Sequence, residues 1–231
     1  MSTNKLSEKL FEKQSNKPIE AILARMRKSV RHQSITWYKG LNTFQILVGA
    51  VLSARTRDPS TEQAVRALFR YYPTPEKLAR APLSKIRKLI KFVGFYKIKA
   101  KYIKDLSKIL VRKYNGKVPK DRVKLQNLPG VGPKVSAIVL SFGFGFPIIP
   151  VDVHVHRVSN RIGLVQTQKP LQTEHKLMAV VPKKYWRELN ELFVLFGQNI
   201  CLPRKPNCFV CPIKKWCDYY AQILAKNYLK Q

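Results

Sequence analysis

Apolar residues recur along most of the chain with the spacing of an amphipathic helix. Residues at i, i+3 and i+4 share one helical face, which a globular protein buries. No stretch shows the strict apolar–polar alternation that is typical of a half-buried strand. The pattern therefore predicts about ten helices. It is clearest in residues 19–30, 44–54, 61–72, 83–93, 100–114 and 186–198.

Proline and glycine separate these helical segments at short intervals, as at Pro82, Gly94, Gly116 and Pro129. Both residue types interrupt a helix, so the connecting loops should be short. We therefore expect an all-α protein. Its 231 residues are enough for one large domain or two small ones.

The charge of the chain is far from balanced. It has 44 Lys and Arg against 13 Asp and Glu, for a formal net charge of +31. Such a surplus destabilises a free compact protein by self-repulsion, and it favours a polyanionic partner. Nucleic acid is the first candidate and an anionic membrane surface the second.

Nothing in the sequence predicts insertion into a membrane or secretion. No apolar run reaches the ~18 residues that a transmembrane helix needs. The first eighteen residues, MSTNKLSEKLFEKQSNKP, are polar and charged, unlike a secretory signal. We expect an intracellular protein without a membrane partner.

The segment LPGVGPK, residues 128–134, predicts a tight turn between two helices. Pro129 favours an extended Leu128 and ends the first helix, while Pro133 suits the first position of the second. Gly130 and Gly132 leave the backbone N–H groups uncovered on either side of Val131. Together with the helix N-terminus, these groups would bind a phosphate. The alternative is a plain corner between helices.

Lys134 follows this turn and precedes a strongly apolar run. The helix dipole disfavours a cation at that end, and the apolar helix beneath limits its solvation. Both effects favour the neutral amine, which is the form that can make a Schiff base. A lysine that only pairs with phosphate explains the local sequence equally well.

Asp152 lies eighteen residues after Lys134 and precedes another helical pattern. It can be the N-cap of that helix. It could also accept a proton from an amine and stabilise a developing cation. His154 and His156 follow in the same helix, where core packing or phosphate contact is a commoner role than catalysis.

All four cysteines fall within seventeen residues, with the spacing C-x6-C-x2-C-x5-C. In an intracellular chain this arrangement favours metal ligation over two disulfides. Zinc sites commonly have two C-x2-C pairs, whereas this segment has one. Four thiolates in a compact loop suit a [4Fe–4S] cluster as well as zinc. The residues are Cys201, Cys208, Cys211 and Cys217.

Taken together, these motifs resemble the endonuclease III family. These are bifunctional DNA glycosylase/AP lyases of the helix-hairpin-helix superfamily. The resemblance rests on LPGVGPK, on PVDVH after it, and on the cysteine spacing. It extends over roughly residues 20–220, with further similar segments at 44–58 and 93–100.

The resemblance implies roles for single residues. Lys134 would be the nucleophile and Asp152 the assisting carboxylate, and the four cysteines would hold a [4Fe–4S] cluster. The partner would be double-stranded DNA with damaged or abasic sites. DNA contacts would come from Leu128, Gly130, Val131, Gly132, Arg55, Phe95 and His154.

The same resemblance implies two helical domains with a DNA cleft between them. Residues 36–146 would form a contiguous six-helix barrel, and residues 1–35 would join 147–231 in the cluster domain. The family often has Gln at the position of Arg55 and Leu at that of Phe95, so the opposite-base preference stays open. A monofunctional mismatch glycosylase and a non-catalytic DNA-binding protein are the alternatives, and a monomer is expected.

Overall fold

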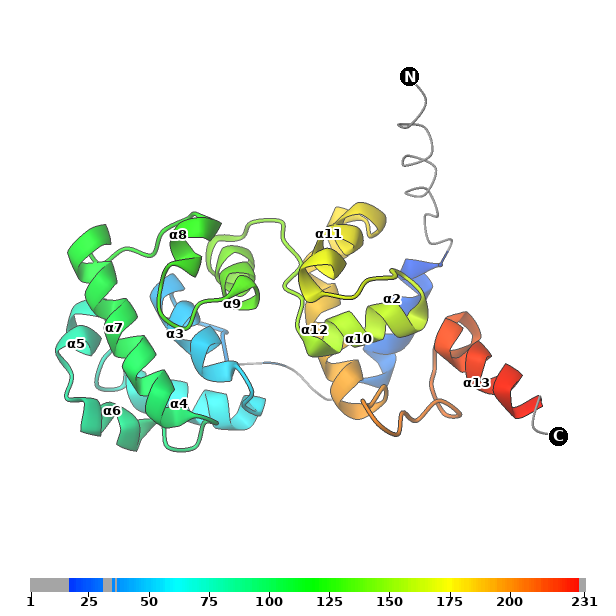
Figure 1. The fold of residues 1–231 in the computed structure, drawn as a ribbon, viewed down its shortest axis with the longest axis horizontal. Helices are drawn as coiled ribbons and strands as arrows, with labels where there is room; N and C mark the ends of the chain where they lie inside the picture. The colour runs from blue at the N-terminus through cyan, green and yellow to red at the C-terminus, as the bar shows by residue number, and fades with distance from the viewer. Residues whose placement is uncertain (1–16, 31–34, 36, 229–231) are drawn as a thin grey trace, which may run out of the picture. The chain divides into compact units, whose positions relative to one another are not determined.

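The protein is built from α-helices. The computed structural model describes residues 17–30, 35 and 37–228 of the chain. These contain twelve α-helices, two 3-10 segments and one π-helical segment, and no β-strand (Figure 1). The predicted all-α class is confirmed. There are more helices than expected because some, such as the five-residue α8 (Arg122–Gln126), are too short to show periodicity.

None of the helices in the described residues is long and apolar enough to cross a membrane.

The chain divides into two compact units. The central unit is Ile35–Pro150, and the terminal unit joins Met1–Ser34 to Val151–Gln231. The predicted domains were 36–146 and 1–35 with 147–231. Their residues 1–16, 31–34, 36 and 229–231 lie outside the described residues. The DNA cleft expected between the domains stays a prediction.

The central unit is organised around α3 (Thr43–Ser53), a helix that is apolar on nearly every side and almost wholly buried. Its start is fixed by a capping box, in which Asn42 and Gln45 exchange side-chain and backbone hydrogen bonds of 3.0 and 3.2 Å. It packs against α4 (Asp58–Phe69), α7 (Tyr96–Tyr114), α9 (Pro133–Ile138) and the π-helical η1 (Val139–Gly143).

The long helix α7 completes this core with an amphipathic face. Ala100, Ile103, Leu106 and Leu110 are fully buried along one stripe. The helix packs against α3, α5 (Pro75–Arg80) and α6 (Leu83–Leu89). The short α8 packs against α9 and leads into the glycine turn.

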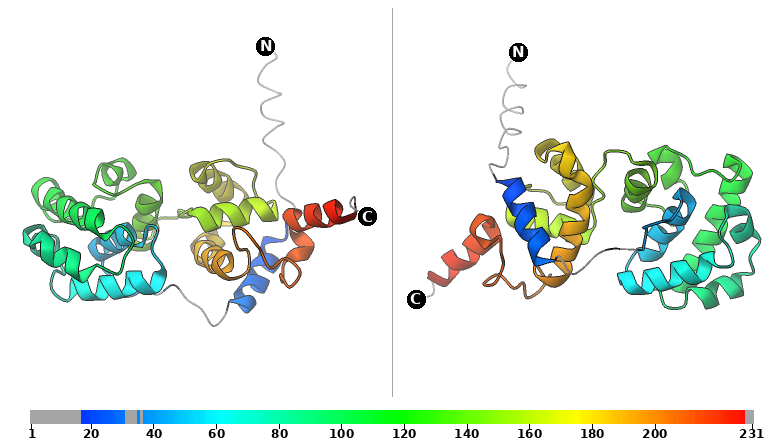
Figure 2. Two further views of the ribbon diagram at one scale, coloured as in Figure 1. Left: turned by 60° about the horizontal axis from the view of Figure 1, so that its bottom comes forward. Right: turned by 180° about the vertical axis from the view of Figure 1, so that it is seen from behind.

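The terminal unit combines segments from before and after the central unit. Its central helix α12 (Trp186–Asn199) buries Phe193 and Phe196 completely. Because α12 packs against both α2 (Ile19–Ser29) and α10 (Val153–Ile162), α2 belongs to this unit (Figure 2). Helix α10 also contacts α11 (Pro170–Val180) and α13 (Asp218–Tyr228).

Candidate active site

The glycine turn joins α8 to α9 as a tight hairpin. The N–H of Val131 donates to the carbonyl of Leu128 at 3.1 Å, and Gly130 adopts the left-handed conformation at φ +77°. The side chains of Leu128 and Val131 are buried, at 3% and 6% exposure. These two apolar residues therefore anchor the hairpin in the core, and only their backbone groups could reach a phosphate.

The two glycines of the hairpin meet different surroundings, which gives a matched pair of variants. A Cβ at Gly130 would lie 2.8 Å from Tyr102 in a left-handed backbone, whereas a Cβ at Gly132 has no heavy atom within 4 Å. Gly130→Ala should lower the free energy of unfolding by about 1–3 kcal/mol. Gly132→Ala should change it by less than about 0.5 kcal/mol, and yet weaken duplex binding because its methyl group crowds the N–H groups.

Urea unfolding and DNA titration measure the two effects separately. If Gly132→Ala bound duplex DNA as tightly as the wild type, the hairpin would not be the phosphate site.

Lys134 is the second residue of α9 and is half-buried. Its positive charge repels that of Lys99, a residue of α7, and so helps to lower the pKa of Lys99. The structure therefore brings two lysines from different helices into electrostatic contact at the start of α9.

Lys99 was not predicted as a site residue, yet it is the most deeply buried lysine of the described residues, at 5% exposure. Its Nζ donates to the carbonyls of Leu52 and Ala54 at 2.8 and 2.5 Å, and to Thr56 Oγ1 at 3.0 Å. Burial, followed by repulsion from Lys134, lowers its pKa to about 8. The sequence held one signal, since Lys99 lies four residues before Ile103 on the apolar stripe of α7.

Arg55 and Phe95 lie together at the surface of the central unit. The Arg55 guanidinium carbon is 5.8 Å from the centroid of the Phe95 ring, and that side chain is 62% exposed. Both residues have positive φ, at 53° and 57°. A left-handed backbone is uncommon for residues other than glycine, and it concentrates at functional sites. An exposed aromatic ring beside a guanidinium suits contact with nucleobases and phosphates.

Asp152 belongs to the terminal unit and caps α10. Its Oδ1 accepts hydrogen bonds from the N–H groups of His154 and Val155 at 2.8 and 3.0 Å. The capping role predicted from the sequence is therefore confirmed. The side chain stays half-buried, so the cap places a carboxylate at a defined point of the helix N-terminus.

The two histidines of α10 lie in different surroundings. His154 Nδ1 is 3.2 Å from Nη2 of Arg157. His156 Nδ1 is 2.6 Å from Thr173 Oγ1, and burial lowers its pKa. His156 therefore fits a structural role in the contact between α10 and α11, whereas His154 stays a candidate for DNA contact.

The four cysteines line one pocket of the terminal unit, and each is half-buried. The pocket lining contains no His, Asp or Glu. Within the described residues, no three His, Cys, Asp or Glu side chains converge closely enough to hold a single metal ion. The donor set around the pocket is therefore thiolate alone, which is the chemistry of zinc or iron–sulfur sites.

Two arginines of α10, which were not predicted as site residues, form hydrogen bonds with the start of the cysteine segment, residues 201–217. Arg157 Nε donates to the carbonyl of Cys201 at 3.1 Å. Arg161 donates to Sγ of the same cysteine at 3.5 Å and to the carbonyl of Leu202 at 2.7 Å. Arg157 and Arg161 are four residues apart, so they lie on the same side of α10. Helix α10 therefore links the Asp152 cap to the cysteines.

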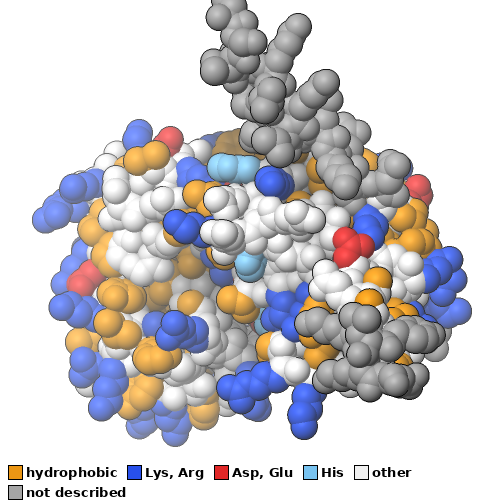
Figure 3. Space-filling view, turned by 45° about the vertical axis from the view of Figure 1, so that its right-hand side comes forward, with side chains coloured by type: hydrophobic (Ala, Val, Ile, Leu, Met, Phe, Trp, Pro, Cys, Tyr) orange, Lys and Arg blue, Asp and Glu red, His pale blue; other side chains and the backbone are white. Residues whose placement is uncertain are grey.

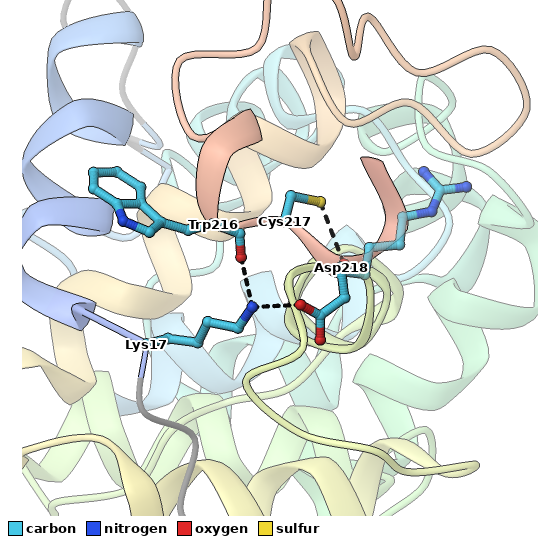
Figure 4. A network of polar contacts seen from close by, with 5 residues as sticks. Lys17, Trp216, Cys217 and Asp218 are labelled. Atoms are coloured by element: carbon cyan, nitrogen blue, oxygen red, sulfur yellow. Dashed lines mark hydrogen bonds and ion pairs between the residues drawn. The ribbon is translucent and has the colours of Figure 1, made fainter. Parts of the chain in front are cut away.

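The last cysteine of the segment is held from two sides (Figure 4). Cys217 Sγ donates to the carbonyl of Arg161 at 3.3 Å. Lys17 contacts both sequence neighbours of this cysteine: its Nζ donates to the carbonyl of Trp216 at 2.8 Å and forms an ion pair with Asp218. Lys17, which precedes α2, thus holds the end of the cysteine segment in place.

Burial shapes the protonation of the thiols. It raises the pKa of Cys211 to about 11, and it raises the pKa values of Cys208 and Cys217 in the same direction. These thiols are protonated at neutral pH, so a metal that binds them must displace protons.

Comparison with known proteins gives the family of the chain. Residues 48–183 match the family model of the HhH-GPD superfamily base excision DNA repair proteins. Endonuclease III of Thermotoga maritima is 45% identical over 183 residues, which are 79% of this chain and 86% of that protein. Endonuclease III of Escherichia coli K12 is 35% identical over 202 residues, 87% of this chain and 95% of that protein.

The chain belongs to the endonuclease III family. A solved structure of a trapped covalent endonuclease III–DNA intermediate superposes with a TM-score of 0.79 at 35% identity, and covers 89% of this chain and 97% of that one. The family match includes Arg55, Lys134 and Asp152, whereas the four cysteines follow its end. The chain is strongly basic, and Lys and Arg side chains are scattered over the face shown in Figure 3, where few acidic side chains lie.

Proposed function

We propose that this protein is a DNA glycosylase of base excision repair that also cleaves DNA at abasic sites. Its substrate would be double-stranded DNA that carries oxidised pyrimidines. The observation that carries the proposal is the position of Lys134, at the first turn of α9 and directly after the glycine hairpin. A phosphate held by the hairpin would lie beside the amine that attacks the sugar.

The proposed attraction to DNA comes from two features of the central unit and from the charge of the whole chain. The hairpin would bind phosphate through its backbone N–H groups. Arg55 and Phe95 would contact the bases around an extruded nucleotide, since base flipping leaves a gap in the stack. The net charge of +31 would add attraction to the whole duplex.

The proposed chemistry starts at the amine of Lys134. The neutral amine attacks C1′, the bond from C1′ to the damaged base breaks, and the base leaves with the bonding electrons and takes up a proton. Ring opening gives a protonated Schiff base. Loss of a C2′ proton then expels the 3′ phosphate, which is β-elimination. Water finally hydrolyses the imine and restores the amine.

Asp152 is proposed to assist in two ways. As a carboxylate it accepts a proton from the attacking amine, and its charge stabilises the cationic sugar. The cap of α10 fixes the orientation of the group, because two backbone N–H groups hold Oδ1. His154, in the first turn of the same helix, is proposed to contact DNA.

The four cysteines are proposed to hold a [4Fe–4S] cluster. The pocket lining offers four thiolates and no His, Asp or Glu, a donor set that fits an iron–sulfur cluster. When bound, the cluster supplies four iron–thiolate bonds that cross-link the segment, and no ligand position is left open for hydrolysis.

The cysteine assignment predicts the metal content. Purified wild-type protein should be brown and contain iron rather than zinc. Cys211→Ser should lose most of the iron, because a serine is a poor iron–sulfur ligand. Val210→Ser is the matched control, since Val210 precedes the cysteine and is 80% exposed. Zinc in the wild type, or unchanged iron in Cys211→Ser, would contradict the assignment.

Borohydride trapping tests the proposed function. The protein is incubated with duplexes that carry an abasic site, an oxidised pyrimidine or a mismatch, with and without borohydride. A covalent adduct on the first two substrates is expected, because reduction fixes the Schiff base. Release of a mismatched base without an adduct would indicate a monofunctional glycosylase. Binding without either reaction would indicate a non-catalytic module.

We further propose that the protein acts inside the cell as a monomer. Sedimentation of the purified protein, alone and with a short duplex, should give one copy per particle.

A further inference from the structure

One lysine and one threonine join three segments of the central unit. Lys99 donates to Leu52 and Ala54 at the end of α3, and to Thr56 in the turn that follows. Thr56 Oγ1 also accepts a hydrogen bond from the N–H of Gly94 at 3.1 Å. We call this set of contacts the Lys99 clamp. It connects the end of α3, the turn 54–57 and the loop before α7.

The two segments held by the clamp carry Arg55 and Phe95. Arg55 lies between two of the clamp's acceptors, and Phe95 follows Gly94 directly. The segments are in close contact, because a Cβ on Gly94 would lie 2.7 Å from the carbonyl oxygen of Arg55. The left-handed Arg55 therefore lies between two residues that the clamp holds, and the left-handed Phe95 directly follows a third.

We propose that Lys99 is a positioning residue, which holds Arg55 and Phe95 together as a single DNA-contacting element. This inference rests on the proposed function, since it takes these two side chains to contact the bases around a flipped nucleotide. Lys99 itself touches no DNA, because it is buried beneath the turn.

The chemistry of the clamp fits a charged lysine. A protonated amine has three N–H donors, and Lys99 has three acceptors within 3.0 Å. With a pKa of about 8, most of the amine is still protonated at pH 7. A buried charge costs free energy that an apolar side chain of similar size would not. In return, it supplies donors to the carbonyls of Leu52 and Ala54, at the end of α3 where carbonyls lack helical partners.

The proposed role of Lys99 predicts different effects on the reactions of two kinds of substrate. Excision of a base from a duplex requires the base to be extruded and its place to be filled, which is the task proposed for Arg55 and Phe95. The reaction of Lys134 with an abasic site in single-stranded DNA requires neither step. Loss of the clamp should therefore slow the first reaction much more than the second.

The test compares Lys99→Met with Lys104→Met. Lys104 is a matched control, because it lies in the same helix and its Nζ donates to the carbonyl of Ala81, at the end of α5, at 2.7 Å. Lys99→Met should slow excision from a damaged duplex by about tenfold or more, which corresponds to about 1.4 kcal/mol. Trapping on a single-stranded abasic oligonucleotide should stay within about twofold. Lys104→Met should change neither rate by more than that.

A double-mutant cycle with Arg55→Ala adds a readout that a loss of stability would not give. If Lys99 acts through Arg55, then Lys99→Met should have much less effect on excision when Arg55 is already alanine. Additive effects of the two substitutions would overturn the proposal.

Three further outcomes would overturn it. One is equal loss on both substrates, which would indicate general damage to the fold. Another is a shifted pH profile on both, which would mean that Lys99 acts on the amine of Lys134. The last is no change in either rate, which would mean that excision does not depend on the clamp. If Lys99→Met does not fold, Thr56→Val removes the shared acceptor and is judged by the ratio of the two rates. Failure of the proposed function looks different, because the wild type itself would then form no adduct on either substrate.

Discussion

Replacing Lys134 by alanine should abolish covalent trapping of the protein on abasic and damaged DNA. No Schiff base can form without the amine, so the yield of adduct should fall by roughly a thousandfold or more. Folding should be little changed, because Lys134 is half-buried in the first turn of α9 and alanine is a good helix former. The adduct is measured on a denaturing gel after borohydride reduction.

The control for this variant removes a positive charge from the neighbouring helix. Lys124 is an exposed lysine of α8, and its alanine variant should trap DNA almost as well as the wild type, with slightly greater sensitivity to salt. An equal adduct yield from Lys134→Ala and Lys124→Ala would mean that another amine is the nucleophile.

Asp152→Asn should slow base excision by about a hundredfold or more while leaving the fold intact. Asparagine is as good an N-cap as aspartate, so the hydrogen bonds to the start of α10 are kept. Only the negative charge and the capacity to accept a proton are lost, and general acid–base groups typically contribute about a hundredfold to ten-thousandfold. Single-turnover excision and thermal unfolding are both measured.

Asp152→Ala separates the two roles of the side chain. It removes the cap as well as the charge, so it should cost about 1 kcal/mol of stability in addition to the lost activity. If Asp152→Asn retained nearly full activity while Asp152→Ala did not, the carboxylate would serve only as a cap. If both were stable and slow, the charge would be the functional feature.

The fold class and the main motifs could be predicted from the sequence, because they depend on residues that are close together in the chain. Helical periodicity depends on residues three and four apart, so the all-α class followed from the pattern alone. The turn at LPGVGPK depends on Pro and Gly at neighbouring positions. For the same reason the cap at Asp152 could be predicted and is confirmed. The thiolate donor set was also visible, since all four cysteines lie in one short segment.

The features that escaped prediction depend on residues far apart in the sequence. Lys99 finds its acceptors forty-three to forty-seven residues away, and Arg157 finds the carbonyl of Cys201 forty-four residues away. Leu128 and Val131 were predicted among the DNA-binding residues, and because their side chains are buried, that contact would come from their backbone groups. Nothing in the local pattern specifies these partners, because only the packing of the helices brings them together.

The helical architecture, a polyanionic partner and the candidate residues Lys134, Asp152 and the cysteines could all be predicted from the sequence alone. The tertiary structure decided how that chemistry is supported. It placed a buried lysine beneath Arg55, set Phe95 against that arginine, and fastened the cysteine segment to α10 and to Lys17. The reason is physical: periodicity and turns arise from neighbours in the chain, whereas a buried charge is stable only where folding supplies its acceptors.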